Sequence, residues 1–264
     1  MSLPITQLGS LQVSRFIIGG NPFCGFSHQT PERNAEMVAW YTDERVVETL
    51  FQAEALGVTT CILRGDTHIT RVLDSYWDQG GTMRWVAQAD EMGKTIADGA
   101  QFCLDHGASA VYLHGGLADH WVAHERRDLI DLFVETVRQG GVPVGMAGHM
   151  PADFLWAEEH LDVDFYMVCY YNPSPRRDAP AHNQHAVEQY LEEDRRERVA
   201  TIARLTRPAI HYKILAAGRN DPEEAFAYAA RHLRPTDAVC VGVYTQENPH
   251  MLADDVELFL RYVR

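Results

Sequence analysis

Two short apolar segments, each containing a histidine at or near its end, constrain the fold more than any other feature of the sequence. They are Ala110–Gly116 (AVYLHGG) and Pro143–His149 (PVGMAGH), of seven residues each. Seven residues are too few for a stable isolated helix or for a membrane span, so we interpret both segments as buried β-strands. A helical pattern follows each of them, and strands that alternate with helices predict a parallel sheet covered on both faces.

The same alternation recurs along the whole chain at spacings of roughly 25–35 residues. The predicted strands are Phe16–Gly20, Thr59–Gly65, Met83–Asp90, Ala110–Gly116, Pro143–His149, Phe165–Tyr171, Ala209–Leu215 and Ala238–Tyr244. Eight strands, each followed by a helix, predict a single closed (β/α)8 barrel over residues 1–264, with an open doubly wound sheet as the alternative. Residues Pro4–Arg15 precede the first strand and read as a short hairpin.

Helices and loops are placed by periodicity and by capping residues. The predicted helices are Thr42–Leu56, Thr67–Trp77, Lys94–His106, Asp119–Gln139, a helix opening at Pro151, Val187–Leu205, a helix capped by Asp221, and a last helix opened by Asn248. Two long loops remain, Asn21–Tyr41 and Asn172–His185. Loops of this length in a compact domain are usually functional, so we expect both to cover the mouth of the barrel and to set specificity.

Charge and cysteine content limit the classes of partner. The chain carries 23 lysine and arginine residues against 37 aspartate and glutamate residues, a net charge of −14, which argues against nucleic acid or an anionic membrane as a partner. We find no signal peptide and no membrane span in the sequence. The five cysteines form no CxxC motif and read as reduced, mostly buried thiols of a cytoplasmic protein. A small-molecule substrate is expected, and a homo-oligomer is left open.

Strand parity decides which side chains enter a barrel, because successive residues of a strand point to opposite faces. Val144 and Met146 are expected to face the helices, which turns His149 inward. In the seventh strand Ile210, Tyr212 and Ile214 are expected to face the helices, which turns His211 and Lys213 inward. The polar residues that this reasoning brings to one mouth are Arg64, Asp66, Gln88, Asp90, His114, His149 and Lys213.

Two kinds of chemistry fit this set of residues. Asp66, Asp90, His114 and His149 could hold a divalent metal ion (Zn, Mn or Fe) with an open coordination position. Alternatively, the same four residues could act as acid and base groups while Arg64 and Lys213 stabilise negative charge. Lys213 could also do acid–base work with a carboxylate and a histidine, or form a Schiff base with a carbonyl.

Four further residues are candidates for substrate binding: Gln88, Tyr171, Asn172 and His28. Cys24 could pair with His28 as a nucleophile, but nothing near it in sequence would lower the pKa of its thiol, so we favour a bystander role.

The chain also resembles the aldo/keto reductase superfamily over nearly its whole length. The resemblance is carried by LGSLQVSRFIIGG (Leu8–Gly20), AVYLHG (Ala110–Gly115), the stretch Gly145–Pro173 with its Tyr-Asn-Pro ending, and AVCVGVYTQENPHMLADDVELF (Ala238–Phe259). It implies a barrel fold and NADPH chemistry carried by an Asp, a Tyr, a Lys and a His. Only His114 matches that set by position.

The other three positions differ from the family. Cys61 stands near the Asp, Asp66 near the Tyr, and Gln88–Asp90 where the Lys is expected, and no Lys/Arg cluster for the extra phosphate of NADPH follows the last strand. We therefore expect a divergent enzyme with altered chemistry.

The predicted function is metal-assisted or acid–base lyase, isomerase or hydrolase action on a small polar carbonyl or sugar-like compound. Two alternatives stand beside it. One is an NADPH-dependent oxidoreductase with a non-standard proton donor, and the other is a non-catalytic sensor of small molecules.

Overall fold

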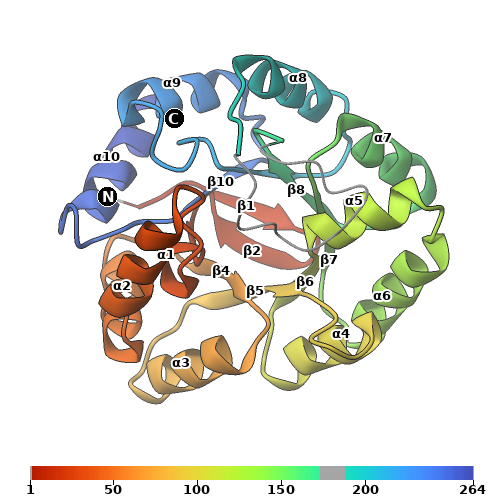
Figure 1. The fold of residues 1–264 in the computed structure, drawn as a ribbon, viewed down its shortest axis with the longest axis horizontal. Coiled ribbons are helices and arrows are strands. Elements are labelled where there is room, and N and C mark those ends of the chain that lie inside the picture. The colour runs from red at the N-terminus through yellow and green to blue at the C-terminus, as the bar shows by residue number, and fades with distance from the viewer. Residues whose placement is uncertain (1, 173–187, 264) are drawn as a thin grey trace.

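Eight parallel strands pair edge to edge until the last meets the first, so the sheet closes into a barrel with the helices outside it (Figure 1). The computed structural model describes residues 2–172 and 188–263. In order around the barrel the strands are β10 (Ala238–Val241), β3 (Phe16–Gly19), β4 (Thr60–Arg64), β5 (Arg84–Ala89), β6 (Ala110–Leu113), β7 (Val144–Gly148), β8 (Phe165–Cys169) and β9 (Ala209–Tyr212). The predicted (β/α)8 TIM barrel is confirmed, and the open sheet is wrong.

Local sequence explains where several helices begin. Five N-cap side chains of the described helices each accept a hydrogen bond from the main-chain N–H three residues further on: Thr30, Thr42, Asp66, Thr95 and Asp221. The helices are α1 (Pro31–Trp40), α2 (Asp43–Ala55), α3 (Thr67–Asp78), α4 (Ile96–Asp105), α5 (Gly115–Ala123), α6 (Arg127–Gln139), α7 (Pro151–His160), α8 (Glu192–Ile202), α9 (Pro222–His232), α10 (Met251–Tyr262) and the short 3-10 helix η1 (Pro22–Cys24). In residues 2–172 and 188–263, none of these helices has both the length and the apolar character needed to cross a membrane.

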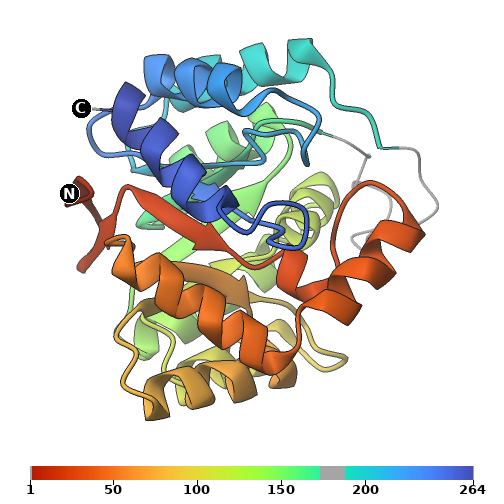
Figure 2. The same ribbon diagram turned by 90° about the vertical axis from the view of Figure 1, so that its left-hand side faces the viewer.

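Two separate hydrophobic clusters lie on the two faces of the closed sheet. The inner cluster takes alternate strand residues such as Ile17, Val86 and Phe165, together with Leu8 and Val13 from the hairpin. That hairpin pairs β1 (Ile5–Leu8) with β2 (Leu11–Ser14), as the sequence predicts. It closes the amino-terminal end of the barrel, at the opposite end of the molecule from α1 (Figure 2).

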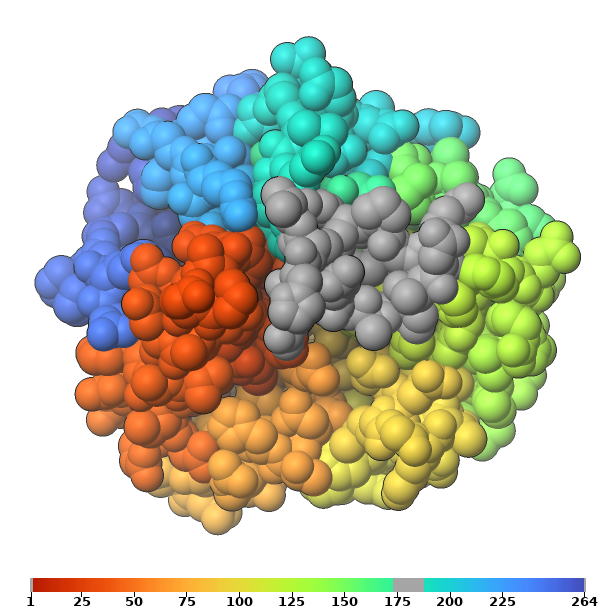
Figure 3. All heavy atoms as spheres, in the orientation of Figure 1, coloured from red at the N-terminus to blue at the C-terminus, as the bar shows by residue number. Residues whose placement is uncertain are grey.

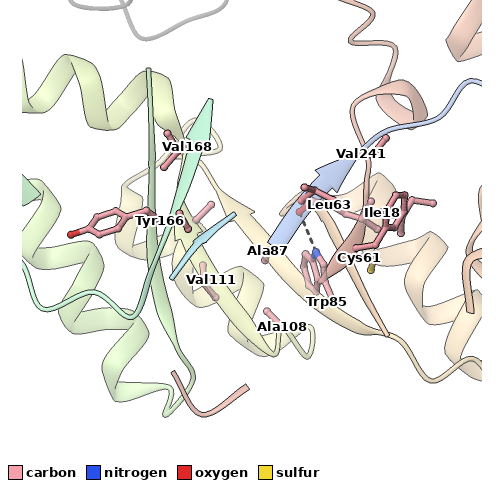
Figure 4. Packing of buried hydrophobic residues seen from close by; sticks show 14 of the residues in the cluster. Ile18, Cys61, Leu63, Trp85, Ala87, Ala108, Val111, Tyr166, Val168 and Val241 are labelled. Carbon is pink, nitrogen blue, oxygen red and sulfur yellow. Dashed lines mark hydrogen bonds between the residues drawn. The ribbon is translucent and has the colours of Figure 1, made fainter. Parts of the chain in front are cut away.

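The outer cluster fills the space between the sheet and the helices (Figure 4). Trp85 of β5 is fully buried there, and its indole Nε1 donates a hydrogen bond of 3.1 Å to the carbonyl of Leu63. Apolar burial of this kind stabilises the fold by roughly 25 cal/mol per Å². All five cysteines lie in the described residues as free thiols, and four of them are buried, as predicted.

Two predicted elements differ from the structure. The predicted helix Asp119–Gln139 is two helices, α5 and α6, because the chain turns between them with Glu125 at φ +55°. The predicted loop Asn21–Tyr41 contains η1 and the ten residues of α1, with Thr30 as N-cap and Pro31 at the first helical position.

Two further predicted elements are shifted in the structure or lie partly outside the described residues. The helix predicted over Val187–Leu205 begins at Glu192, and Val187 lies outside the described residues. Of the predicted loop Asn172–His185, only Asn172 lies within them.

The predicted orientation of β9 is wrong. Ile210 belongs to the inner cluster and Tyr212 packs against it, whereas His211 faces the helices and is 0% exposed. There the His211 ring bonds to the hydroxyl of Tyr170 at 2.9 Å and to the carboxylate of Asp237 at 3.3 Å. Both faces of this strand are buried, so the polarity pattern does not distinguish them.

Asp237 is the centre of this outward-facing network. Its carboxylate is 0% exposed and accepts hydrogen bonds from the main chain of Ala209 and from the Arg234 guanidinium, at 2.9 and 2.7 Å. Burial alone would raise its pKa, but hydrogen bonds from His211 and Arg234 outweigh burial and lower the pKa of Asp237 to about 2. The free carboxylate has a pKa of about 3.9, so this contribution to stability is complete above about pH 4 and is lost as the pH falls toward 2.

We therefore expect Asp237→Asn to lower the free energy of unfolding by about 3–5 kcal/mol at pH 7, because it removes the counter-charge of the Arg234 guanidinium and a hydrogen-bond partner of the buried His211 ring. The difference from wild type should shrink between about pH 4 and pH 3. Urea unfolding of wild type and variant at pH 7, pH 4 and pH 3 measures this difference. Asp162→Asn is the control, since its side chain is 81% exposed and should matter by less than about 0.5 kcal/mol. Equal effects of the two changes would contradict the expectation.

Candidate active site

The carboxyl ends of the barrel strands open on the face that carries the first loop and α1. Figure 3 views the molecule onto this face, where red-to-orange atoms of the N-terminal segment border its centre. Arg64 and Gln88 are paired in register at the ends of β4 and β5, and the Tyr112 hydroxyl of β6 donates a hydrogen bond of 3.0 Å to Gln88 Oε1. Tyr112 belongs to the inner cluster, as parity predicts for β6. Polar groups of three consecutive strands thus meet at one end of the barrel.

His149 is held in one orientation by a carboxylate that the sequence did not single out. Asp119 of α5 is 1% exposed; its Oδ2 lies 2.7 Å from His149 Nδ1, and its Oδ1 accepts the His149 main-chain N–H at 3.0 Å. The other ring nitrogen, Nε2, lies 3.5 Å from the Tyr212 hydroxyl. Burial raises the pKa of Tyr212 well above its usual value, so the phenol stays protonated and can donate a hydrogen bond.

Glycines allow this close packing. A Cβ at Gly148 would lie 3.2 Å from Asp119 Oδ1, and a Cβ at Gly115 would lie 3.0 Å from His149 Cε1. The glycines beside the two strand-end histidines therefore leave room for the ring and for its carboxylate. The signal that could have identified Asp119 is a charged residue on the buried face of α5, beside Leu117 and Trp121.

His114 forms a second, looser pair with a carboxylate. Its Nδ1 lies 3.9 Å from Asp90 Oδ2, and the two side chains are 24% and 36% exposed. Because Gly115 follows His114 and packs against the His149 ring, the two imidazoles come from neighbouring segments of chain. The sequence analysis places Asp90, His114 and His149 at the mouth.

Arg64 and Asp66 form a third pair beside a cavity of about 450 Å³. Arg64 Nε lies 3.1 Å from Asp66 Oδ2, and the guanidinium lies 5.1 Å from the centre of the Phe26 ring. Asp66 Oδ1 in turn accepts the Ile69 N–H at the start of α3. Asp66 thus has a positioning role in addition to its charge.

His28 and Lys213 meet around Glu188, which precedes α8. His28 Nδ1 lies 3.0 Å from Glu188 Oε1, and the Tyr190 hydroxyl donates to Glu188 Oε2 at 2.9 Å. Burial opposes ionisation here, but the hydrogen bond and charge of His28, together with the charge of Lys213, lower the pKa of Glu188 to about 2. Lys213 follows β9 with φ +57°, a backbone strain that is frequent at functional sites.

Tyr171 and Asn172 are placed mainly by structural contacts. Tyr171 is 2% exposed in the outer cluster, and its hydroxyl accepts a hydrogen bond of 2.8 Å from Asn220. The main-chain N–H of Asn172 donates to Asp194 at 3.0 Å. The structure therefore gives Tyr171 a role in packing, and its role in substrate binding stays a prediction.

The residues predicted as metal ligands do not gather into a ligand set. Within residues 2–172 and 188–263, no group of three or more His, Cys, Asp and Glu side chains could hold a metal ion. Of the four predicted ligands, Asp66 is engaged with Arg64, and His149 with Asp119. The described residues therefore do not support the metal prediction for Asp66, Asp90, His114 and His149.

Cys24 does not form the nucleophile pair that was left open. His28 is engaged with Glu188, and burial, together with the nearby charge of Asp66, raises the pKa of the Cys24 thiol to about 12. A thiol with that pKa has almost no thiolate at neutral pH.

The residues after β10 do not fit the extra phosphate of NADPH. Residues 242–248 contain no Lys or Arg, and Arg33, which reaches this segment, pairs with Glu247 at 2.7 Å. The space where Gly242 lacks a side chain is filled by Pro22, whose Cδ would lie 2.7 Å from a Cβ. An anionic dinucleotide requires cations or open N–H groups near its phosphates, and residues 242–248 supply no cation for the extra phosphate.

The Asp119–His149 contact places the proton of the neutral His149 ring on Nδ1, which can be tested. In Asp119→Asn, an amide group replaces the carboxylate oxygen that faces Nδ1, so the neutral ring should move its proton from Nδ1 to Nε2. Loss of the charge-assisted hydrogen bond should also lower the free energy of unfolding by about 1–3 kcal/mol. Long-range ¹H–¹⁵N NMR spectra measure the tautomer. The exposed control Asp128→Asn should leave His149 unchanged, and an unchanged tautomer in Asp119→Asn would refute the assignment.

Comparison with known proteins supports the fold. No protein-family model matches the chain, and no curated protein sequence matches it. A solved structure from Pseudomonas aeruginosa, described as a candidate aldo-keto reductase, is similar with 16% identity, coverage of 98% of this chain and 96% of that one, and a TM-score of 0.66. An aldo-keto reductase from Bacillus halodurans in its holo form is 13% identical, with coverage of 99% and 97% and a TM-score of 0.59.

A third similar structure is named for a different reaction. It is a truncated 3-deoxy-D-arabino-heptulosonate 7-phosphate synthase from Thermotoga maritima, 16% identical, with coverage of 98% and 90% and a TM-score of 0.55. Identities this low establish architecture, and one barrel fold supports many chemistries. The chain therefore has the barrel fold of the aldo-keto reductases, as the resemblance in its sequence predicts.

Proposed function

We propose that this protein is an acid–base enzyme that moves a proton next to the carbonyl of a small polar carbonyl or sugar-like compound, in an isomerase or lyase reaction. The observation that carries the proposal is the buried contact of 2.7 Å between Asp119 and His149 Nδ1. A carboxylate on one ring nitrogen fixes the tautomer and leaves the other nitrogen as the base. His–carboxylate pairs with this arrangement are common proton-transfer groups.

His149 Nε2 is the proposed base. It would take the proton from the carbon beside the carbonyl, while the electron pair of the C–H bond moves onto the carbonyl oxygen. Tyr212, 3.5 Å from Nε2, is the proposed hydrogen-bond donor to that oxygen, because its phenol remains protonated. In an isomerisation, a proton is returned to the former carbonyl carbon, and the hydroxyl on the deprotonated carbon loses its own proton to become the new carbonyl. In an elimination, the electrons of the enolate expel a leaving group from the carbon next to the deprotonated one, and the carbonyl is restored.

His114 is the proposed acid that acts together with His149, and the carboxylate of Asp90 stabilises the protonated form of the His114 ring. The loose separation of 3.9 Å between the two side chains suits a group that exchanges protons with substrate and solvent. Arg64 and Lys213 would stabilise negative charge on the substrate, and Gln88 would hold one of its polar groups. Asp66 would act through Arg64, which it positions.

The similarity to solved enzymes supports catalysis as opposed to a sensor role, since similar structures carry the names of reductases and a synthase. It does not choose among their chemistries. The choice of acid–base chemistry rests on the two histidine–carboxylate pairs and on the absence of a fit to NADPH after β10.

Exchange of substrate hydrogen with solvent tests the proposal without knowledge of the final product. In D₂O, wild-type protein is expected to exchange the α-hydrogen of at least one compound in a panel of small hydroxycarbonyl compounds, followed by ¹H NMR. His149→Gln should lower the rate by about 10²–10⁴-fold and Tyr212→Phe by about 10-fold or more. Neither a chelator nor added NADPH should change the wild-type rate.

A matched control is His160→Gln, since His160 bonds to the Trp156 carbonyl at the end of α7, away from the mouth. Its exchange rate should stay within twofold of wild type. Unchanged exchange in His149→Gln would refute the assignment of the base. Exchange that requires NADPH would favour the oxidoreductase, and binding of panel compounds without any exchange would favour the sensor.

A further inference from the structure

The cavity beside Arg64 has a composition that the proton-transfer site does not explain. Its volume is about 450 Å³, and it lies between the first loop, α1 and the end of β4. Its lining is largely apolar, with two phenylalanines, a valine, a cysteine and a tyrosine, next to one arginine, one aspartate and one histidine: Phe23, Cys24, Phe26, Val38, Tyr41, Arg64, Asp66 and His68. Apolar walls with a few fixed polar groups are typical of sites for small organic ligands.

We propose that this cavity binds an organic carboxylate, with the acid group on the guanidinium of Arg64 and an apolar or aromatic body against Phe23, Phe26 and Val38. The inference rests on the proposed function in one respect, since it names the substrate class of the same mouth. The substrate is then a carbonyl compound that carries a carboxylate and an apolar part.

Arg64 is held in place by contacts that leave its far end available. Its Nε is taken by Asp66 at 3.1 Å, and its planar face lies over Phe26 at 5.1 Å. In the part of the chain that the structure describes, neither terminal nitrogen of Arg64 has a hydrogen-bond partner. The side chain is 34% exposed, on the cavity wall. An arginine fixed in this way presents two parallel N–H donors, which match the two oxygens of a carboxylate.

The remaining lining groups add no free charge. Asp66 is neutralised by Arg64 and also caps α3, whereas His68 Nε2 lies 3.1 Å from Asp43. Cys24 remains a neutral thiol, since burial raises its pKa to about 12. The Arg64–Asp66 pair has no net charge, so a ligand with one carboxylate is held by the outer N–H donors of the guanidinium, whereas a dianion would also be repelled by Asp66.

The strand register leads from the cavity toward the centre of the mouth. Arg64 is paired with Gln88, and Gln88 accepts the Tyr112 hydroxyl at 3.0 Å. A ligand anchored by its carboxylate at Arg64 can extend along this row toward the centre of the mouth. This arrangement separates the anchoring group from the carbonyl that reacts.

Calorimetric titration with phenylacetate, and with its neutral analogue phenylacetamide, tests the proposal. Wild-type protein is expected to bind phenylacetate at least tenfold more tightly than phenylacetamide. Arg64→Gln should weaken phenylacetate binding at least tenfold and leave phenylacetamide binding nearly unchanged. Arg64→Lys should fall between wild type and Arg64→Gln, because an ammonium keeps the charge but lacks the paired donors.

Arg138→Gln is a matched control, since Arg138 is also ion-paired, to Asp164 at 2.6 Å, and its side chain is 36% exposed. It should bind phenylacetate like wild type. Val38→Glu is a second test that does not disturb the interior, because Val38 is 59% exposed on the rim and glutamate suits a helix. The added negative charge should weaken phenylacetate binding several-fold. Circular dichroism and thermal unfolding confirm that each variant is folded.

The outcomes separate this inference from the proposed function. His149→Gln should abolish exchange yet keep the Kd for phenylacetate within twofold. Binding through Arg64 without any exchange by wild type would leave the carboxylate site standing and remove the proposed reaction. Equal affinity for acid and amide, or no effect of Arg64→Gln, would overturn the carboxylate site even if exchange depends on His149.

Discussion

Closure of the sheet is the constraint on which every other feature depends. In a closed barrel each strand residue faces either the interior or the helices, and the carboxyl ends of all eight strands open at one face. The hairpin closes the amino-terminal end with Leu8, Leu11 and Val13, which join the inner cluster. Only the carboxyl end is then left for polar side chains, and strands far apart in sequence present their last residues to a common mouth.

A buried histidine–carboxylate pair at that mouth is the second constraint. A carboxylate that is 1% exposed is costly unless its oxygens are satisfied, and Asp119 uses one oxygen for the His149 ring and the other for the His149 main chain. The two groups therefore depend on each other, and α5 is fixed to the end of β7. Because Gly148 and Gly115 leave the necessary space, the motifs AGH and HGG have a structural reason beyond turn formation.

The sequence predicts this architecture well because apolar runs and capping residues act locally. β4, β5, β6 and β7 fall within the predicted runs, and parity places Tyr112 and Ala147 in the inner cluster. Side-chain direction fails at β9, because His211 is satisfied by Asp237 on the outside while apolar Ile210 fills the inside. Polarity cannot identify the inner face of a strand whose polar residue has found a buried partner.

The sequence predicts which residues form the candidate site better than it predicts which of their side chains contact one another. Arg64, Gln88, His114 and His149 were expected at the mouth from their positions at strand ends, where the chain itself fixes the direction. Asp119 was not found, because it lies on a helix that the sequence merged with α6. Pairing depends on how a helix packs against the strand ends, and that contact joins residues that are 30 positions apart.

Three basic side chains at the carboxyl ends of β4, β6 and β7 each have a carboxylate partner. The pairs are Arg64 with Asp66, His114 with Asp90, and His149 with Asp119. Such pairing matters in a chain with a net charge of −14, since the long-range field repels an anionic ligand. Recognition of a carboxylate must then come from short-range donors at a fixed arginine. Added salt screens the long-range repulsion more than it weakens a contact inside a cavity, so moderate ionic strength should speed association while changing dissociation little. A fixed and paired arginine therefore suits an acidic protein that binds a small anion.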